Sequence, residues 1–232
     1  MKSFLDHLEC TSCSGTFNAE FPHQTCPNCS KILYPKYDIE NARVAFRKES
    51  LNDRPHTMWR YREMLPVRND ENIVTLGEGM TPMIKTNRLA TTIGSNHLYI
   101  KDEGVNPSAS FKSRGMSAAV SRAKELGLTK LSVPTAGNAG GALAIYAAAG
   151  NMEAHIFMPV DAQASNLKES AISGAHLTLV DGLIGDAGKV SREMAAKHGL
   201  FDLSTLKEPY RVEGKKTMGY EIAEQFGWQV PD

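Results

Sequence analysis

Four cysteines near the N-terminus form the first pattern that could do chemistry. Cys10 and Cys13 make one Cys-x-x-Cys pair, and Cys26 and Cys29 make a second pair. Two such turns can present four thiolates tetrahedrally, which suits zinc at about 2.3 Å per sulfur. The spacing predicts a structural zinc ribbon over residues 1–35, because so small a segment needs a metal to fold. The alternatives are unligated surface cysteines and a redox dithiol, for which one pair would suffice.

A lysine at the start of a predicted helix is the second candidate. Lys112 lies in the segment NPSASFKSRG and follows Ser108 and Ser110, both good helix N-cap residues. The dipole and unpaired N–H groups of a helix N-terminus disfavour a cation and lower the pKa of a lysine there. A neutral lysine amine is the nucleophile that forms Schiff bases. The alternative is an ordinary solvated lysine at a helix end.

A glycine-rich loop follows the next predicted strand. The segment PTAGNAGG, residues 134–141, joins a strand to a helix, so its backbone N–H groups can bind an anion. Its glycines do not have the G-x-G-x-x-G spacing of a dinucleotide-binding loop, although Asp161 follows at about the right distance. A nicotinamide-dependent oxidoreductase and a tight turn without a ligand are therefore the alternatives.

These residues belong to a repeated strand–helix pattern that begins near residue 73. Apolar periodicity predicts strands at 98–101, 130–134, 154–159, 176–180 and 201–203, and helices at 111–126, 138–149, 163–173, 186–198 and 215–227. A glycine at each helix end is typical of a left-handed C-cap. Such units indicate an α/β fold in which the strands form a parallel sheet, with right-handed crossovers and helices on both faces. The charged residues 36–72 are expected to be helical or connecting.

The composition excludes several classes of partner. The 232 residues carry 26 acidic and 26 basic side chains, so nothing favours nucleic acid or an anionic membrane. The chain contains no apolar run near the ~20 residues that span a bilayer, and its N-terminus does not resemble a secretory signal. Clustered cysteines of this kind are typical of a reducing compartment. We therefore predict a cytoplasmic protein.

Four segments, in a fixed order, resemble one enzyme family. They are LGEGMTP at 76–82, NPSASFKSRG around Lys112, PTAGNAGG at 134–141 and YRVEGKKT at 210–217. Together they are similar to the threonine synthases, which are pyridoxal-phosphate enzymes of fold type II. The resemblance runs from about residue 73 to the end of the chain. Some members of the family also carry an N-terminal zinc ribbon.

The resemblance implies a domain plan and an assembly. Two open parallel-sheet domains of the tryptophan synthase β-like architecture would hold the cofactor in the cleft between them. The larger domain would comprise residues 36–130 together with 205–232, and the smaller domain residues 131–204. Family members continue into a glycine-rich cup for the cofactor phosphate and a partner for the pyridine nitrogen. The larger domain is therefore expected to be truncated here, and a homodimer is expected.

The resemblance also implies how the cofactor is held. Lys112 would be the Schiff-base lysine of pyridoxal 5'-phosphate and would then move protons as base and acid. Asn138 would donate a hydrogen bond to the phenolic oxygen of the cofactor. The loop that begins at Thr135 and includes Gly137 and Asn138 would bind the substrate carboxylate.

Two further residues, Ser204 and Arg211, match family positions that hold a substrate phosphate, and Lys216 would add positive charge there. A guanidinium fork suits a phosphate dianion. The implied reaction converts O-phospho-L-homoserine and water to L-threonine and phosphate. A loop serine and ordinary surface cations are the alternatives.

Four positions depart from the patterns that are common in the family. Ser108 replaces a threonine but keeps its hydroxyl, and Ala109 stands where glycine is usual. Ser113 replaces an aspartate beside the reactive lysine, and Ala139 replaces a threonine. These changes preserve the cofactor chemistry and leave other substrates open. A serine/threonine dehydratase or a cysteate synthase is one alternative, and a non-catalytic homologue that acts as a binding module is another.

Overall fold

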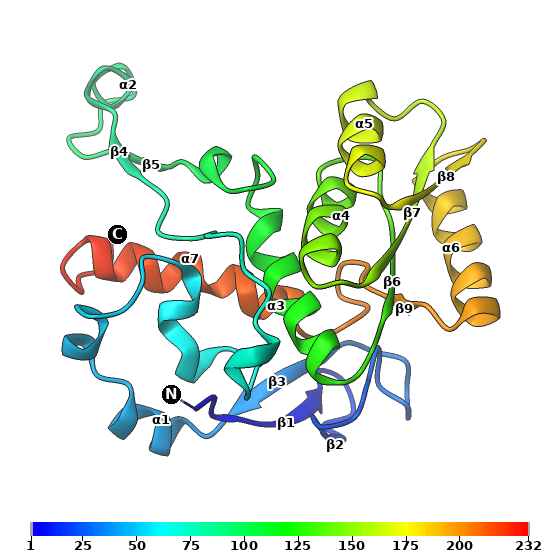
Figure 1. Cartoon of the computed structure of the whole chain (residues 1–232). Coiled ribbons are helices and arrows are strands. Elements are labelled where there is room, and N and C mark those ends of the chain that lie inside the picture. The colour runs from blue at the N-terminus through cyan, green and yellow to red at the C-terminus, as the bar shows by residue number, and fades with distance from the viewer. Residues whose placement is uncertain (1, 232) are drawn as a thin grey trace.

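The N-terminal residues fold as a small antiparallel sheet in the computed structural model, which describes residues 2–231. Its strands pair in the order β2-β1-β3: β1 (Leu5–Cys10), β2 (Thr16–Asn18) and β3 (Leu33–Tyr37). Buried side chains of this sheet, among them Leu8 and Leu33, join the same hydrophobic core as Met116 and Leu143. The ribbon therefore packs into the body of the protein (Figure 1).

Short helices connect the ribbon to the rest of the chain, and a buried carboxylate lies in the segment that follows them. The helices are α1 (Ile39–Ala45), η1 (Lys48–Leu51), η2 (Met58–Met64) and η3 (Asp70–Asn72), as expected for a helical or connecting segment. Glu78 of the LGEGMTP segment is fully buried. It accepts hydrogen bonds from the Trp59 indole at 3.1 Å and the Tyr146 hydroxyl at 2.6 Å. This carboxylate thus joins residues that lie far apart in the sequence.

The strand predicted at 98–101 lies outside the parallel sheet. It forms β5, which pairs antiparallel with β4 in a hairpin that extends from the body (Figure 1). The elements of this region are β4 (Met83–Lys85), α2 (Asn87–Thr92), β5 (Tyr99–Lys101) and η4 (Glu103–Val105). The expectation of a parallel partner is wrong for this strand, because the nearby β4 supplies an antiparallel one.

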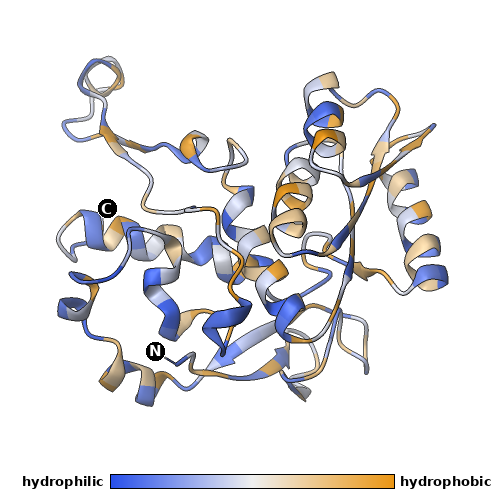
Figure 2. Cartoon of the chain, in the orientation of Figure 1, coloured by the Kyte–Doolittle hydropathy of each residue, from blue (hydrophilic) through white to orange (hydrophobic). Residues whose placement is uncertain are grey.

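A four-stranded parallel sheet forms the α/β part of the chain, as predicted. Its order is β8-β7-β6-β9, with strands β6 (Lys130–Pro134), β7 (Glu153–Pro159), β8 (His176–Val180) and β9 (Phe201–Asp202). Its helices are α4 (Ala139–Ala149), α5 (Ala164–Ile172) and α6 (Ile184–His198). Ile156 packs with α4 on one face, whereas its neighbour Phe157 packs with α6 on the other. Figure 2 shows how apolar α4 is along much of its length.

Four of the five helix-end glycines adopt the predicted left-handed conformation. Gly127, Gly174, Gly199 and Gly227 have φ between 65° and 80°. Gly150 is right-handed, and the following residue, Asn151, takes the left-handed position instead. Asparagine tolerates that conformation because its short side chain can hydrogen-bond locally. Within residues 2–231, the helices are all too short or too polar to cross a bilayer.

Helices α3 (Lys112–Glu125) and α7 (Arg211–Gln225) cross in backbone contact. A Cβ at Gly214 would lie 1.9 Å from the carbonyl oxygen of Arg114, so only glycine fits there. The buried Arg114 side chain bridges the crossing, with 2.7 Å between Nη2 and Glu221 Oε2 and between Nε and Glu103 Oε2. Because α7 begins four residues before the predicted residue 215, Arg211 forms its first turn.

We predict that Gly214→Ala separates these helices and destabilises the protein. Overpacking of this kind costs about 1–3 kcal/mol, and the contact here is with rigid backbone. Gly219→Ala, on the same helix with open space around it, is the matched control. It should be neutral or stabilise by up to about 1 kcal/mol. Chemical denaturation measures both changes, and equal unfolding free energies for the two variants would contradict the prediction.

Candidate active site and metal centre

Lys112 is the first residue of α3, as the sequence predicts. Its side chain is half-buried, and its Nζ lies 3.5 Å from the centroid of the Phe111 ring. Burial lowers the pKa of Lys112, and the positive charge of Arg211 lowers it further. The amine is therefore more readily neutral than that of a solvated lysine, which is what nucleophilic chemistry requires.

The loop before Lys112 is held by a chain of hydroxyl groups. The Ser113 hydroxyl lies 2.8 Å from that of Ser108 and accepts a hydrogen bond from the Ser108 N–H at 3.0 Å. Ser110 accepts one from the Lys112 N–H at 3.3 Å. Ala109 has a φ of 49°, in the region that glycine adopts without strain. The backbone thus explains why the family commonly has glycine at this position.

Two cationic side chains of α7 face Lys112. Arg211 is buried and donates from Nη1 to the Leu203 carbonyl oxygen at 2.5 Å. Lys215, one helical turn later, has its Nζ 5.5 Å from the Phe111 ring centroid. Burial lowers the pKa of Lys215, and the charges of Arg211 and Lys112 add to this effect. Three basic groups therefore gather where α3 and α7 begin.

Glu208 balances part of this charge and was not identified from the sequence. It is buried and accepts hydrogen bonds from the N–H groups of Tyr210 at 2.6 Å and Arg211 at 3.0 Å. Burial raises its pKa to about 7, against the lowering effect of these amides and of the Arg211 charge. The signal that could have identified Glu208 is its position just before a helix, where a carboxylate can accept hydrogen bonds from the unpaired N–H groups.

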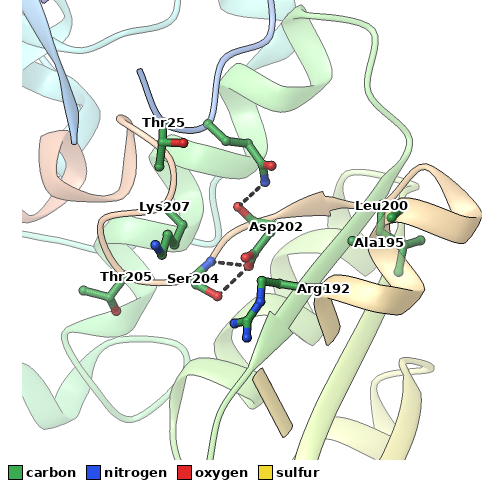
Figure 3. Close-up of a pocket in the computed structure, with 10 residues that line it drawn as sticks. Thr25, Arg192, Ala195, Leu200, Asp202, Ser204, Thr205 and Lys207 are labelled. Atoms are coloured by element: carbon green, nitrogen blue, oxygen red, sulfur yellow. Dashed lines mark hydrogen bonds between the residues drawn. The ribbon is translucent and has the colours of Figure 1, made fainter. Parts of the chain in front are cut away.

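Two predicted phosphate-binding residues do not join this group. The Lys216 Nζ lies 3.9 Å from the Tyr37 ring centroid and pairs with Glu213. The Ser204 hydroxyl donates to Asp202 Oδ1 at 2.5 Å. Ser204 and Arg192 line a cavity of about 470 Å³ that does not include the residues of this group (Figure 3). That cavity is formed by the ribbon, α6 and the segment after β9.

The glycine-rich loop leads from β6 into α4, as predicted. Thr135 is buried, and its hydroxyl bonds both the N–H and the carbonyl of Gly137, at 3.1 and 3.2 Å, so it holds the shape of the loop. Asn138 is exposed immediately before α4. A Cβ at Gly140 would meet the Met158 side chain at 2.4 Å. α4 therefore packs closely on β7 at this glycine, and a larger residue would require the Met158 side chain to move.

The four predicted zinc ligands come together. The Sγ atoms of Cys10 and Cys29 lie 3.5 Å apart, and those of Cys13 and Cys26 lie 3.6 Å apart. All four are free thiols whose sulfurs lie within 4.8 Å of one another. Sulfurs bound tetrahedrally at about 2.3 Å lie roughly 3.8 Å apart, so the donor set fits zinc. Hydrogen bonding from the Cys13 backbone lowers the pKa of Cys10 to about 6, whereas the contact with the Cys10 sulfur raises the pKa of Cys29.

Comparison with known proteins places the chain in a family. Residues 74–232 match the family described as "Pyridoxal-phosphate dependent enzyme". The chain belongs to this family. Pyridoxal phosphate is the cofactor of its members. The lowered pKa of Lys112 fits that cofactor, because a neutral lysine amine can form a Schiff base with it. The family match removes the reason for considering a nicotinamide enzyme.

The curated relatives confirm the resemblance to threonine synthases. The chain is 36% identical over 224 residues to "Threonine synthase" of Methanocaldococcus jannaschii and 35% identical over 227 residues to that of Methanosarcina acetivorans. These matches cover 96% and 97% of this chain but 55% of each relative, so the chain spans about half their length.

Among solved structures, maize serine racemase is 25% identical over 63% of this chain and 45% of the other, with a TM-score of 0.59. Escherichia coli diaminopropionate ammonia lyase is 16% identical and covers 98% of this chain and 60% of the other, with a TM-score of 0.62. At this identity the ammonia lyase shows the fold alone. Both likenesses agree with an α/β fold of the fold type II class.

Removal of zinc is predicted to unfold the ribbon. Cys26→Ala deletes a buried ligand, so the three-stranded sheet should lose its metal and become sensitive to protease. Ser12→Ala, an exposed change in the first cysteine turn, is the control and should bind zinc as before. Bound zinc is measured by mass spectrometry of the native protein. A protease-resistant ribbon in the metal-free variant would contradict the prediction.

The Arg211 charge is predicted to hold down the pKa of Lys112. Arg211→Gln removes that charge, so the pH at which the Lys112 amine reacts with an acetylating reagent should rise. Arg211→Lys keeps a cation and should leave the midpoint closer to that of the native protein. Arg192→Gln, which removes a cation from the cavity that Ser204 lines, is the control. Mass spectrometry of the labelled peptide against pH gives the midpoint, and an unchanged midpoint in Arg211→Gln refutes the assignment.

Proposed function

We propose that the chain carries part of the active site of a threonine synthase, which converts O-phospho-L-homoserine and water to L-threonine and phosphate. The observation that carries the proposal is the gathering of Lys112, Arg211 and Lys215 at one helix crossing. A phosphorylated amino acid bears a dianionic group that such a cluster can neutralise. The identity to threonine synthases over nearly the whole chain supports the same substrate.

Arg211 and Lys215 are the proposed phosphate-binding groups. The Arg211 Nε is buried and has no hydrogen-bond partner among the described residues, so it can donate to a ligand oxygen without losing an existing bond. A ligand oxygen that accepts a hydrogen bond from such a buried, unpaired donor makes binding more favourable. Lys215 takes this role in place of Lys216, whose ammonium lies against Tyr37. Ser204 is left out because it lines the cavity beside Arg192.

Lys112 is the proposed base and acid. When bound, pyridoxal phosphate supplies an electron sink for the substrate carbon beside the amino group. The Lys112 amine, kept neutral by burial and by Arg211, can accept a proton from that carbon and return it elsewhere. In this proposal the substrate carboxylate binds to the loop from Thr135 to Gly140, and the exposed Asn138 orients the cofactor.

The surrounding organisation is proposed in the same way. In this proposal the smaller domain comprises residues 131–204 and includes the parallel sheet with its helices, except for Lys130, with which β6 begins. Residues 36–130 with 205–232 would form the larger domain, in which α3 and α7 cross. A homodimer in the cytoplasm follows from the family resemblance. This assembly and this location fit a biosynthetic enzyme that acts on a small molecule.

The test compares substrates on the purified chain supplied with pyridoxal phosphate. Phosphate release from O-phosphohomoserine should exceed keto-acid release from serine or threonine. Lys112→Ala should reduce phosphate release by about 10³-fold, since it removes the base. Arg211→Gln should mainly raise the KM for O-phosphohomoserine, by roughly 10- to 100-fold, because a charge-assisted contact is lost. Lys124→Ala, a change at a half-buried lysine late in α3, should change neither phosphate release nor the KM.

The outcome that overturns the proposal is specific. Keto-acid release from serine that outpaces phosphate release would indicate a dehydratase. The lack of both activities, together with failure of borohydride to fix the cofactor onto Lys112, would leave a non-catalytic homologue. Either result removes threonine synthesis from this chain.

A further inference from the structure

Two histidines and a glutamate lie together at the end of the sheet opposite the glycine-rich loop. Glu153 and His176 are the first residues of β7 and β8, whereas the loop that includes Asn138 follows the last residue of β6. Because all four strands are parallel, these residues lie at the amino-terminal ends and the loop lies at a carboxyl-terminal end. The proposed active site therefore does not use this cluster.

The register of the two strands brings the imidazoles into contact. His155 pairs directly with His176 between β7 and β8, and parallel strands place register partners on the same face. The ring centroids lie 4.7 Å apart at an interplanar angle of 23°. Glu153, two residues before His155, points to the same face, and its Oε2 lies 3.3 Å from His155 Nε2. The donor atoms of all three residues lie within 4.8 Å of one another.

We propose that Glu153, His155 and His176 bind one divalent transition-metal ion of the zinc type. Two imidazoles and one carboxylate suit zinc, nickel and copper, whereas calcium and magnesium prefer oxygen ligands alone. Atoms bound to one ion at about 2.1 Å lie no more than about 4.2 Å apart. Glu153 and His176 are exposed, so small rotations of their side chains can close the remaining gap. Solvent supplies the other ligands on this open face.

The neighbouring charges permit a cation. Lys130, the strand partner of Glu153, has its Nζ 3.9 Å from Glu153 Oε1. The other carboxylate oxygen, Oε2, is the one that faces His155. Lys130 is also largely exposed, so it can turn into solvent when the ion binds. One carboxylate oxygen thus remains directed at the histidines.

The ion would join the edge of the sheet to its interior. β8 is an edge strand that pairs with β7 alone among the described residues, and several of its residues are exposed. A metal held by His155 and His176 crosses that single pairing. Because the ion binds the folded sheet and not the separated strands, it should raise the resistance of the protein to unfolding.

The experiment uses the full chain with its cysteine site already filled by one equivalent of zinc. Isothermal titration with further zinc should show one additional ion per chain, and the same zinc should raise the thermal transition. His155→Gln and His176→Gln should each weaken the additional site at least about tenfold, and Glu153→Gln should weaken it less. His97→Gln, an exposed histidine on the hairpin, is the matched control and should bind as the native chain does.

A measurement on the native chain guards against variants that misfold. The imidazole NMR signals of His155 and His176 should shift together as the additional zinc is added, while that of His97 stays in place. Absence of the additional ion overturns the proposal. Native-like binding by both histidine variants, or a shift confined to other histidines, overturns it as well.

Discussion

A backbone contact between two helices determines where the reactive groups lie. Gly214 of α7 rests against the carbonyl of Arg114 in α3, at a separation that admits no side chain. Lys112 begins α3 and Arg211 begins α7, so each stands within one turn of the contact. The effect of the Arg211 charge on the pKa of Lys112 follows from this geometry. The glycine in YRVEGKKT therefore acts on the chemistry although it carries no functional group.

Buried ion pairs maintain the crossing and tie distant segments to it. Arg114, two residues after Lys112, reaches Glu221 of α7 and Glu103 of η4, and the Thr81 hydroxyl joins Glu103 at 2.7 Å. Loss of one partner from such a buried pair typically costs about 3–5 kcal/mol, because the other charge stays behind unpaired. Glu78 plays a similar part through hydrogen bonds. The conspicuous sequence segments thus hold one another in place as well as carrying the reactive lysine.

The strands and helices with clear apolar periodicity could be predicted from the sequence. The pairing partners of the short strands could not. β6 and β8 have the predicted bounds because their apolar runs sit between clear turn signals. A three-residue strand such as β5 carries no information about its partner. Lys215 was missed because the helix was expected to begin there. Because α7 begins at Arg211, residues 211 and 215 share one face of the helix. Lys216 points to another face, toward Tyr37. The residue types alone do not show which of the two lysines joins Arg211.

The departures near Lys112 have a common electrostatic consequence. The family commonly has an aspartate where this chain has Ser113, and a carboxylate beside the lysine would favour its charged form. Ser113 is fully buried and satisfies its hydroxyl with Ser108, so the loop is held without any charge. The lowering of the Lys112 pKa by burial and Arg211 is then unopposed from this side. The serine therefore preserves the shape of the loop and makes the amine more readily neutral, which keeps Lys112 suited to proton transfer.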